Sequence, residues 1–302
     1  MRNYVIVLAM VLCSLASAVQ FPAKVDFLNE FSGNEEALTA AIREFDQKEL
    51  AYLSSLRGTL NAANEEHAKQ LKDARLRIEE LKDIYETALI LYPENARLHN
   101  FLGELEYDYR NQTAAALKEW NKALQLDPKY STVFNNMSLH YFHIGDYEKG
   151  LKLLDEAIRL DKKHPDYMYN MIQMYLIHWK HIGEIRGWSN KKVFREAMKM
   201  SKKLTEMQPN DFHIRQDYAN NFYSSESMEV EVKWKDAAEA WAMARELAKS
   251  PEEIFYTWLN EARTWIKDKN TSEAGRCLNE ARQIRPDSPV VKSLSEQIGQ
   301  GN

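Results

Sequence analysis

The chain has 302 residues, with 40 Lys or Arg against 45 Asp or Glu, so its formal net charge is −5. This mildly acidic balance argues against a broad nucleic-acid-binding surface. The length exceeds what one compact core usually holds, unless the chain grows by adding copies of one unit. Only ten glycines and eight prolines interrupt the chain, which favours an all-helical protein.

Residues 1–18 have the features of a secretory signal peptide. Arg2 gives a positive start, residues 5–15 are apolar, and residues 16–18 match the small-residue cleavage pattern. The apolar run is too short to span a bilayer as a mature helix, and the alternative is an uncleaved anchor. We therefore expect cleavage after residue 18, a mature chain without an integral membrane segment, and a periplasmic or secreted protein.

Two further features bear on the compartment. Cleavage would leave Cys277 as the only cysteine, so we expect it to be a small buried residue and stability to come from packing. An intermolecular disulfide is the alternative. Three tripeptides match the N-glycosylation pattern, at Asn111, Asn136 and Asn270. Because Asn136 falls within a predicted helix, we interpret the matches as chance, which favours a bacterial periplasm.

Residues 19–92 are expected to form a helical N-terminal extension. Within residues 34–91, apolar or small residues recur mostly at alternating steps of three and four, the spacing of a heptad seam. The seam consists of Leu53, Leu56, Leu60, Ala63, His67, Leu71, Ala74, Ile78, Leu81, Tyr85 and Ala88. Gly58 and Asn61 could fold this region into an intramolecular hairpin, which we favour. An unbroken seam would instead assemble chains into a coiled-coil homo-oligomer.

The segment after this extension repeats itself. Residues 100–128 and 134–162 each read as two short amphipathic helices, and their matching positions lie about 34 residues apart. In the second helix of each copy, Trp120 corresponds to Leu154. A period of this length indicates a stacked array of helix pairs, in which each pair buries its apolar face only against its neighbours.

The residues within each copy resemble the pattern of the tetratricopeptide repeat (TPR) family. That pattern alternates bulky, small and aromatic residues, with an Ala late in the second helix and a Pro after it. The clearest copy has Phe134, Met137, Ser138, Tyr141, Gly145, Tyr147, Gly150, Leu154 and Ala157. The copy before it has one extra residue in its turn and contains Leu102, Gly103, Tyr107, Ala116, Trp120, Ala123 and Pro128. The last copy contains Trp258, Ala262, Trp265, Ala274, Leu278, Ala281 and Pro286.

This resemblance implies an all-α, right-handed TPR superhelix, an α-solenoid of about five repeats over residues 93–287. Residues 288–302 should form a capping helix and tail, because Ser288 and Pro289 give a helix start that an apolar face follows. The array would therefore follow the N-terminal extension and end on the capping helix.

In TPR arrays the first helix of each pair lines a concave groove. Counting from the aromatic of each copy predicts that these residues face the groove: Asn100, Asn136, Asn170, Gln173, Asn220, Asn260 and Arg263, with Asn135 and Gln216 beside them. Most of them are primary amides, which both donate and accept hydrogen bonds and could hold the backbone of an extended peptide. The alternative is that Asn is simply frequent at one of these positions in the family.

Two copies are stretched by insertions between their first and second helices. Residues 179–192 contain Trp179 and Trp188 among basic residues, and residues 224–235 are rich in glutamate. Because the two copies are neighbours, we expect the insertions to project from one edge. Trp179 and Trp188 are therefore candidates for a secondary docking edge, and locally packed helix extensions are the favoured alternative.

The sequence contains no motif for chemistry. It lacks a Gly-x-Ser-x-Gly elbow, a phosphate-binding glycine loop and a His-Glu-x-x-His helix. His140 with His143 and His178 with His181 are each three residues apart, but neither pair has a third zinc ligand at helical spacing. We therefore expect no enzymatic activity, no metal site and no cofactor. The basic run at residues 191–203 is expected to face solvent, where it could meet an acidic partner or anionic headgroups.

These features together predict a protein–protein interaction scaffold of the cell envelope that binds a peptide or helix of a partner protein in its groove. The alternative is an oligomeric envelope-organising protein that assembles through its N-terminal helices and docks an enzyme on its repeats.

Overall fold

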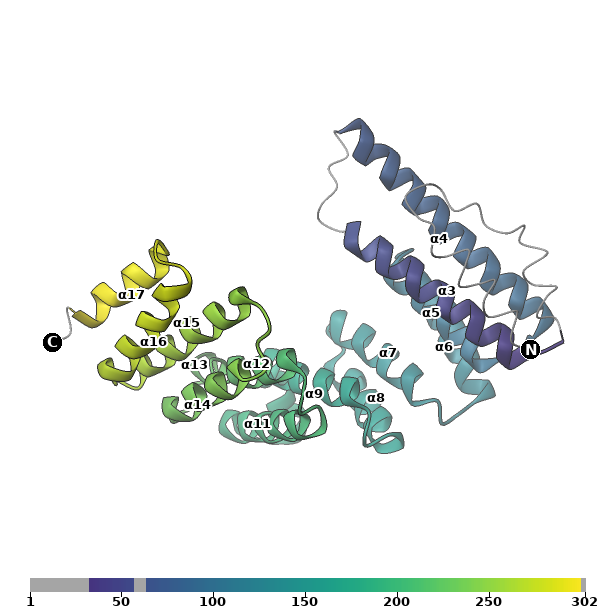
Figure 1. Cartoon of the computed structure of the whole chain (residues 1–302). Coiled ribbons are helices and arrows are strands. Elements are labelled where there is room, and N and C mark those ends of the chain that lie inside the picture. Colours follow the sequence, from purple (N-terminus) through teal and green to yellow (C-terminus); the bar gives the residue numbers. More distant parts are fainter. Residues whose placement is uncertain (1–32, 57–63, 300–302) are drawn as a thin grey trace. The chain divides into compact units, whose positions relative to one another are not determined.

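In the computed structural model, which describes residues 33–56 and 64–299, all regular secondary structure is helical (Figure 1). The all-α prediction is therefore confirmed for these residues. The predicted signal peptide lies outside them, as do Gly58 and Asn61. The chain divides into two compact units, with the boundary between Val133 and Phe134.

The described residues of the first unit contain four helices before the boundary. They are α3 (Glu35–Leu56), α4 (Glu65–Leu91), α5 (Ala96–Asp108) and α6 (Thr113–Leu126). Helices α3 and α4 contact each other, both contact α5, and α5 pairs with α6. Leu38 of α3, Leu81 of α4 and Leu98 of α5 share one buried cluster, and Arg77 of α4 pairs with Glu49 of α3 at 2.7 Å. The C-terminal residues of the predicted heptad seam thus pack against other helices of the same chain.

The second unit is a series of helix pairs. The simple pairs are α7 (Ser131–His143) with α8 (Tyr147–Leu160) and α15 (Pro251–Lys267) with α16 (Thr271–Ile284). Between them lie α9 (Pro165–Ile177), α10 (Trp179–Arg186), α11 (Asn190–Met207), α12 (Phe212–Asn221), α13 (Ser224–Ser227) and α14 (Trp234–Arg245). Here α9 packs on α11 and α12 packs on α14, while the short helices α10 and α13 occupy the two insertions. Finally, α17 (Pro289–Gly299) packs on α16 and α15.

From α5 to α16, each connection between two paired helices contains one residue with a left-handed backbone. These residues are Asn111, Gly145, Gly187, Glu229 and Lys269. Around Gly145, for example, the Asp146 N–H donates to the Tyr141 carbonyl at 2.9 Å, and around Lys269 the Asn270 N–H donates to Trp265 at 2.9 Å. This is the bond that closes a helix C-terminus in a Schellman motif. In the α5–α6 turn the Gln112 N–H reaches back six residues to Glu106, which confirms the predicted extra residue.

Small residues stand where paired helices approach each other most closely. A Cβ atom at Gly103 of α5 would lie 2.5 Å from the ring of Trp120 on α6, and one at Gly150 of α8 would lie 2.9 Å from the ring of Phe142 on α7. Any larger residue would push the aromatic ring aside. The small residues of the repeat pattern therefore mark the positions where the paired helices are closest, and the aromatic residues fill the space beside them.

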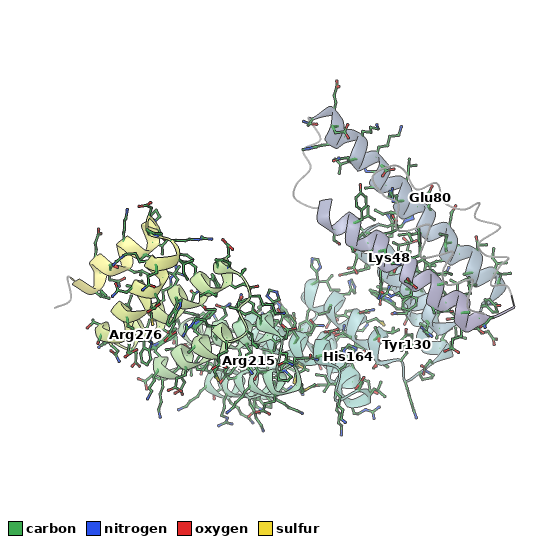
Figure 2. The ribbon with its side chains drawn as sticks, in the orientation of Figure 1. Lys48, Glu80, Tyr130, His164, Arg215 and Arg276 are labelled. Carbon is green, nitrogen blue, oxygen red and sulfur yellow. The ribbon has the colours of Figure 1, made fainter. Side chains whose placement is uncertain are left out.

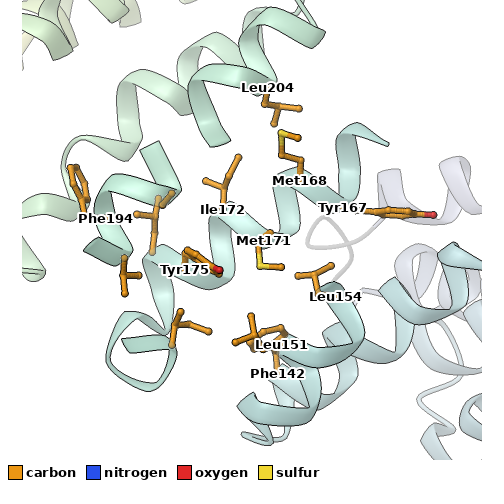
Figure 3. Close-up of a cluster of buried hydrophobic side chains, with 14 of the residues drawn as sticks. Phe142, Leu151, Leu154, Tyr167, Met168, Met171, Ile172, Tyr175, Phe194 and Leu204 are labelled. Carbon is orange, nitrogen blue, oxygen red and sulfur yellow. The ribbon is translucent and has the colours of Figure 1, made fainter. Parts of the chain in front are cut away.

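Within the second unit, buried clusters join side chains of neighbouring helices. In the cluster of Figure 3, Phe142 of α7 and Leu154 of α8 pack with Met171 of α9 and Leu204 of α11. A second cluster joins α15, α16 and α17 through Leu259, Cys277 and Val291. The expected burial of Cys277 is confirmed. Among the described helices, none is long and apolar enough to cross a bilayer.

Candidate functional site

Amide side chains from two neighbouring repeats meet on α7 and α9. The Asn170 Nδ2 of α9 donates to the Asn135 Oδ1 of α7 at 2.9 Å, and the Asn135 Nδ2 donates to the Asn136 Oδ1 at 3.4 Å. Asn135 is buried, whereas Asn136 and Asn170 are half-buried, as is Gln173 one turn further along α9. Polar groups capable of donating and accepting therefore lie together on the first helices of two repeats.

A carboxylate and a phenol continue this polar surface from α9 to α12. The Tyr169 phenol of α9 and the Asp217 carboxylate of α12 interact. Burial raises the pKa of Asp217, and the interaction with the Tyr169 hydroxyl opposes that rise. Burial also raises the pKa of Tyr169, and the Asp217 charge adds to it. Asn220, half-buried, lies one turn beyond Asp217 on α12.

On α15 the polar residues are held more tightly by their own helix. The Arg263 Nη1 donates to the Asn260 Oδ1 at 2.9 Å, and the Asn260 Nδ2 donates to the Tyr256 carbonyl at 2.9 Å. Burial raises the pKa of Tyr223 to about 12, although the positive charge of Arg263 opposes the rise. Tyr256 is 39% exposed and lies edge-on to Trp241 of α14.

The predicted groove residues thus fall into three groups. Asn136, Asn170 and Gln173 come together, half-buried, on α7 and α9. Asn220 and Arg263 are half-buried on the first helices of the next two repeats. The remaining two are buried and satisfied locally: Asn260 is 4% exposed, and Asn100 of the first unit is 0% exposed, with its Nδ2 donating to Glu104 at 2.8 Å.

Tyr169, Asp217 and Tyr256 are polar residues of these first helices that the sequence reasoning did not single out. Tyr169 directly precedes a predicted amide in sequence, and Asp217 lies three residues before another. Because residues three apart lie on the same face of a helix, the spacing of Asp217 from Asn220 could have placed Asp217 beside the predicted amide. The exposure of Tyr256 depends on how α15 is rotated against α14, which the spacing alone does not fix.

Trp179 and Trp188 line one pocket at the first insertion. The pocket has a volume of about 530 Å³ and is lined by Trp179, Lys180, Gly183, Glu184, Gly187, Trp188 and Asn190. The Lys192 Nζ lies 4.3 Å from the centroid of the Trp188 ring, within cation–π range. A basic side chain therefore borders the pocket at the start of α11.

The two insertions contact each other and also pack locally. The Asn190 side chain donates to the Met228 carbonyl of the second insertion, while Ile182 of α10 and Met228 are fully buried. Glu226 pairs with Lys267 of α15. The insertions are thus adjacent, as predicted, and they are anchored by apolar packing as well as by polar contacts.

The histidine pair of α9 and α10 packs on aromatic rings of the preceding repeat. The ring of His178 stacks on Phe142 with centroids 5.9 Å apart, and His181 stacks on Tyr147 with centroids 4.1 Å apart. Burial, followed by the charge of His181, lowers the pKa of His178. Within residues 33–56 and 64–299, no group of three or more His, Cys, Asp or Glu side chains is placed to bind a metal ion.

Comparison with known proteins identifies the architecture. No family model matches the chain, and no curated protein matches it. Among solved structures, that of YrrB, a TPR protein, is similar at 19% identity and a TM-score of 0.51, covering 70% of this chain and 97% of YrrB. The C-terminal part of a TPR repeat-containing protein from Cytophaga hutchinsonii is similar at 12% identity and a TM-score of 0.57, covering 89% of this chain and 98% of its own. At these identities the likeness concerns the fold alone, and the chain therefore has the paired-helix fold of a TPR protein.

Proposed function

We propose that this protein is an interaction scaffold of the cell envelope, and that it binds an extended peptide segment or helix of a partner protein across α7, α9 and α12. The observation that carries the proposal is the group of half-buried amides formed by Asn136, Asn170 and Gln173 on two adjoining first helices. YrrB, which has the same fold, is described as having an unusual peptide-binding site. The envelope location rests on the signal-peptide pattern of residues 1–18.

The chemistry of this surface suits a main-chain ligand. A primary amide can accept a peptide N–H and donate to a peptide carbonyl, irrespective of the side chains between them. The bond between Asn135 and Asn170 restricts one of the amides before a ligand arrives, which lowers the entropy lost on binding. Tyr169 beside these amides adds a flat aromatic ring that an apolar side chain can cover.

Peptide selection followed by a binding measurement tests the proposal. Peptides from a random displayed library are selected on the intact protein, and the affinity of the best one is measured by fluorescence anisotropy. The double variant Asn136→Ala, Gln173→Ala should weaken binding by roughly 10- to 100-fold, because each lost hydrogen bond contributes about 1 kcal/mol.

The matched control is Asn279→Ala with Gln283→Ala, which removes the same two residue types from exposed positions of α16. This variant should bind as the unmodified protein does. An equal loss in both variants, or a selection that yields no binding peptide, would contradict the proposal.

Chemical changes in the selected peptide separate backbone recognition from helix recognition. Methylation of alternate backbone nitrogens should abolish binding of an extended peptide, because each methyl removes a donor. If alanine substitutions at positions i, i+3, i+4 and i+7 matter more than N-methylation, the ligand binds as an amphipathic helix.

A further inference from the structure

Helix α11 presents a row of cations to solvent. Its 18 residues include six Lys or Arg, namely Lys191, Lys192, Arg195, Lys199, Lys202 and Lys203. All are exposed except Lys192, which is half-buried. The steps of three and four residues place most of them on one face of the helix, over a length of about 18 Å at 1.5 Å per residue. Figure 2 shows the side chains that extend from this helix.

Almost none of this charge is neutralised within the protein. Among the described residues, the only ion pair of the row joins Arg195 to Glu196 of the same helix, at 3.4 Å and partly exposed. Of the two carboxylates of α11, Glu206 near the C-terminal end is exposed and Glu196 is half-buried. The row is therefore a local positive surface on a chain whose formal net charge is −5.

The position of the first two lysines is unfavourable for the helix itself. Ser189 caps the N-terminus by accepting from the Lys192 N–H, and Lys191 and Lys192 fall in the first turn. The helix dipole places partial positive charge at this end, so cations there reduce helix stability. Helix formation alone therefore does not account for two lysines at this end.

We propose that the outer face of α11 binds the anionic surface of a lipid bilayer. Five of the six cations are lysines, which are compact hydrated charges suited to a diffuse field, whereas arginine is the residue that matches carboxylates in bidentate pairs. Protein–protein interfaces are depleted in lysine and enriched in arginine. The row also begins beside Trp188, over whose ring Lys192 lies, and Trp is enriched at the membrane–water interface.

The strength of this association follows from the number of charges. Each lysine near an anionic surface is expected to strengthen binding about fivefold, and the attraction falls off within a Debye length. The row should therefore hold the protein reversibly at low salt and release it as salt rises. This contact does not rest on peptide binding across α7, α9 and α12.

Co-sedimentation of the full chain with lipid vesicles tests the proposal. One set of vesicles contains equal parts of phosphatidylglycerol and phosphatidylcholine, and the other contains phosphatidylcholine alone, which reports any binding through the apolar N-terminal run. The protein should bind the anionic vesicles only. The triple variant Lys199→Gln, Lys202→Gln, Lys203→Gln should bind them on the order of 100-fold more weakly, while helix propensity is nearly unchanged.

A second triple variant separates this face from net charge. Lys122→Gln, Lys129→Gln and Lys163→Gln remove the same charge from exposed positions elsewhere, and this variant should retain binding within a few-fold. Circular dichroism and thermal melting establish that both variants are folded. Equal losses in the two variants would overturn the assignment to α11. Absence of binding to anionic vesicles, or tighter binding to soluble polyglutamate than to the vesicles, would overturn the membrane assignment.

Discussion

A buried carboxylate forms ion pairs with arginines from the two neighbouring helices of the last repeats. Glu261 on α15 is 3% exposed, and it accepts from Arg245 of α14 at 2.5 Å and from Arg276 of α16 at 3.2 Å. The Arg245 guanidinium also lies 3.3 Å from the centroid of the Trp258 ring, and Figure 2 labels Arg276. One carboxylate thus connects three successive helices, and its loss would leave two arginines without this partner.

In the first unit, the Asp46 carboxyl on α3 should make the free energy of unfolding depend on pH. Burial raises the pKa of this carboxyl to about 6, although Arg43 opposes the rise, and the Arg43–Asp46 pair is 2.8 Å long. An unfolded aspartate titrates near pH 3.9. Between these two values the folded protein binds more protons than the unfolded chain. The contribution of Asp46 to stability is therefore full below pH 4 and declines as the pH rises to about 6.

The variant Asp46→Asn should remove this decline. Two pKa units correspond to about 3 kcal/mol, so the stability of the variant relative to the unmodified protein should rise by that order between pH 4 and pH 7. Urea unfolding at several pH values measures the difference. Asp236→Asn, which removes an exposed carboxylate, controls for charge. A constant difference between the Asp46 variant and the unmodified protein across the pH range would refute the assignment.

At the scale of elements, the turns between paired helices set the repeat geometry. The five turns between α5 and α16 that join paired helices each contain a residue with positive φ, yet only two of these residues are glycine. Lys269 has φ 61° and Glu229 has φ 53°, a conformation that costs an L-residue roughly 1 kcal/mol and glycine little. The repeat pattern is thus preserved at these turns even where the residue is unfavourable.

The variant Lys269→Gly should therefore increase the free energy of unfolding by about 1 kcal/mol. Lys122→Gly, at an exposed position inside α6, should lower it by a similar amount because glycine disfavours a helix interior. Urea denaturation followed by circular dichroism compares the two variants. If Lys269→Gly is no more stable than the unmodified protein, the left-handed turn is not a source of strain.

The helix pairs could be predicted because small residues opposite aromatic residues mark the positions where two helices approach closely. Gly103 with Trp120 and Gly150 with Phe142 are contacts whose residue types already specify close approach. The candidate site was less predictable, because a rotation of one helix decides whether an amide is buried. Asn260 and Asn170 share the residue type, yet Asn260 bonds to its own helix while Asn170 bonds to α7. Sequence spacing identifies the helix of each residue but not its partner.

At the scale of the whole molecule, the apolar surface of the N-terminal helices determines whether the chain assembles with itself. Leu81, Ile84 and Tyr85 of α4 are buried in the same cluster as Leu38 and Ile42 of α3. Residues of the seam that pack inside one chain are not available to a second copy. The alternative coiled-coil oligomer would need these contacts to be exchanged between chains.

We therefore expect the intact protein to have the mass of a single chain in multi-angle light scattering. Deleting residues 19–92 would uncover Leu98, Phe101 and Leu102 of α5, which pack against α3 and α4. Because exposed apolar surface of this kind drives association, the truncated chain should form larger species or lose the α5–α6 pair. The coiled-coil alternative requires the opposite result, in which the intact protein is a dimer or larger and the deletion yields a folded monomer. The direction of the mass change on deletion thus decides between a hairpin that covers the first repeat and helices that join separate chains.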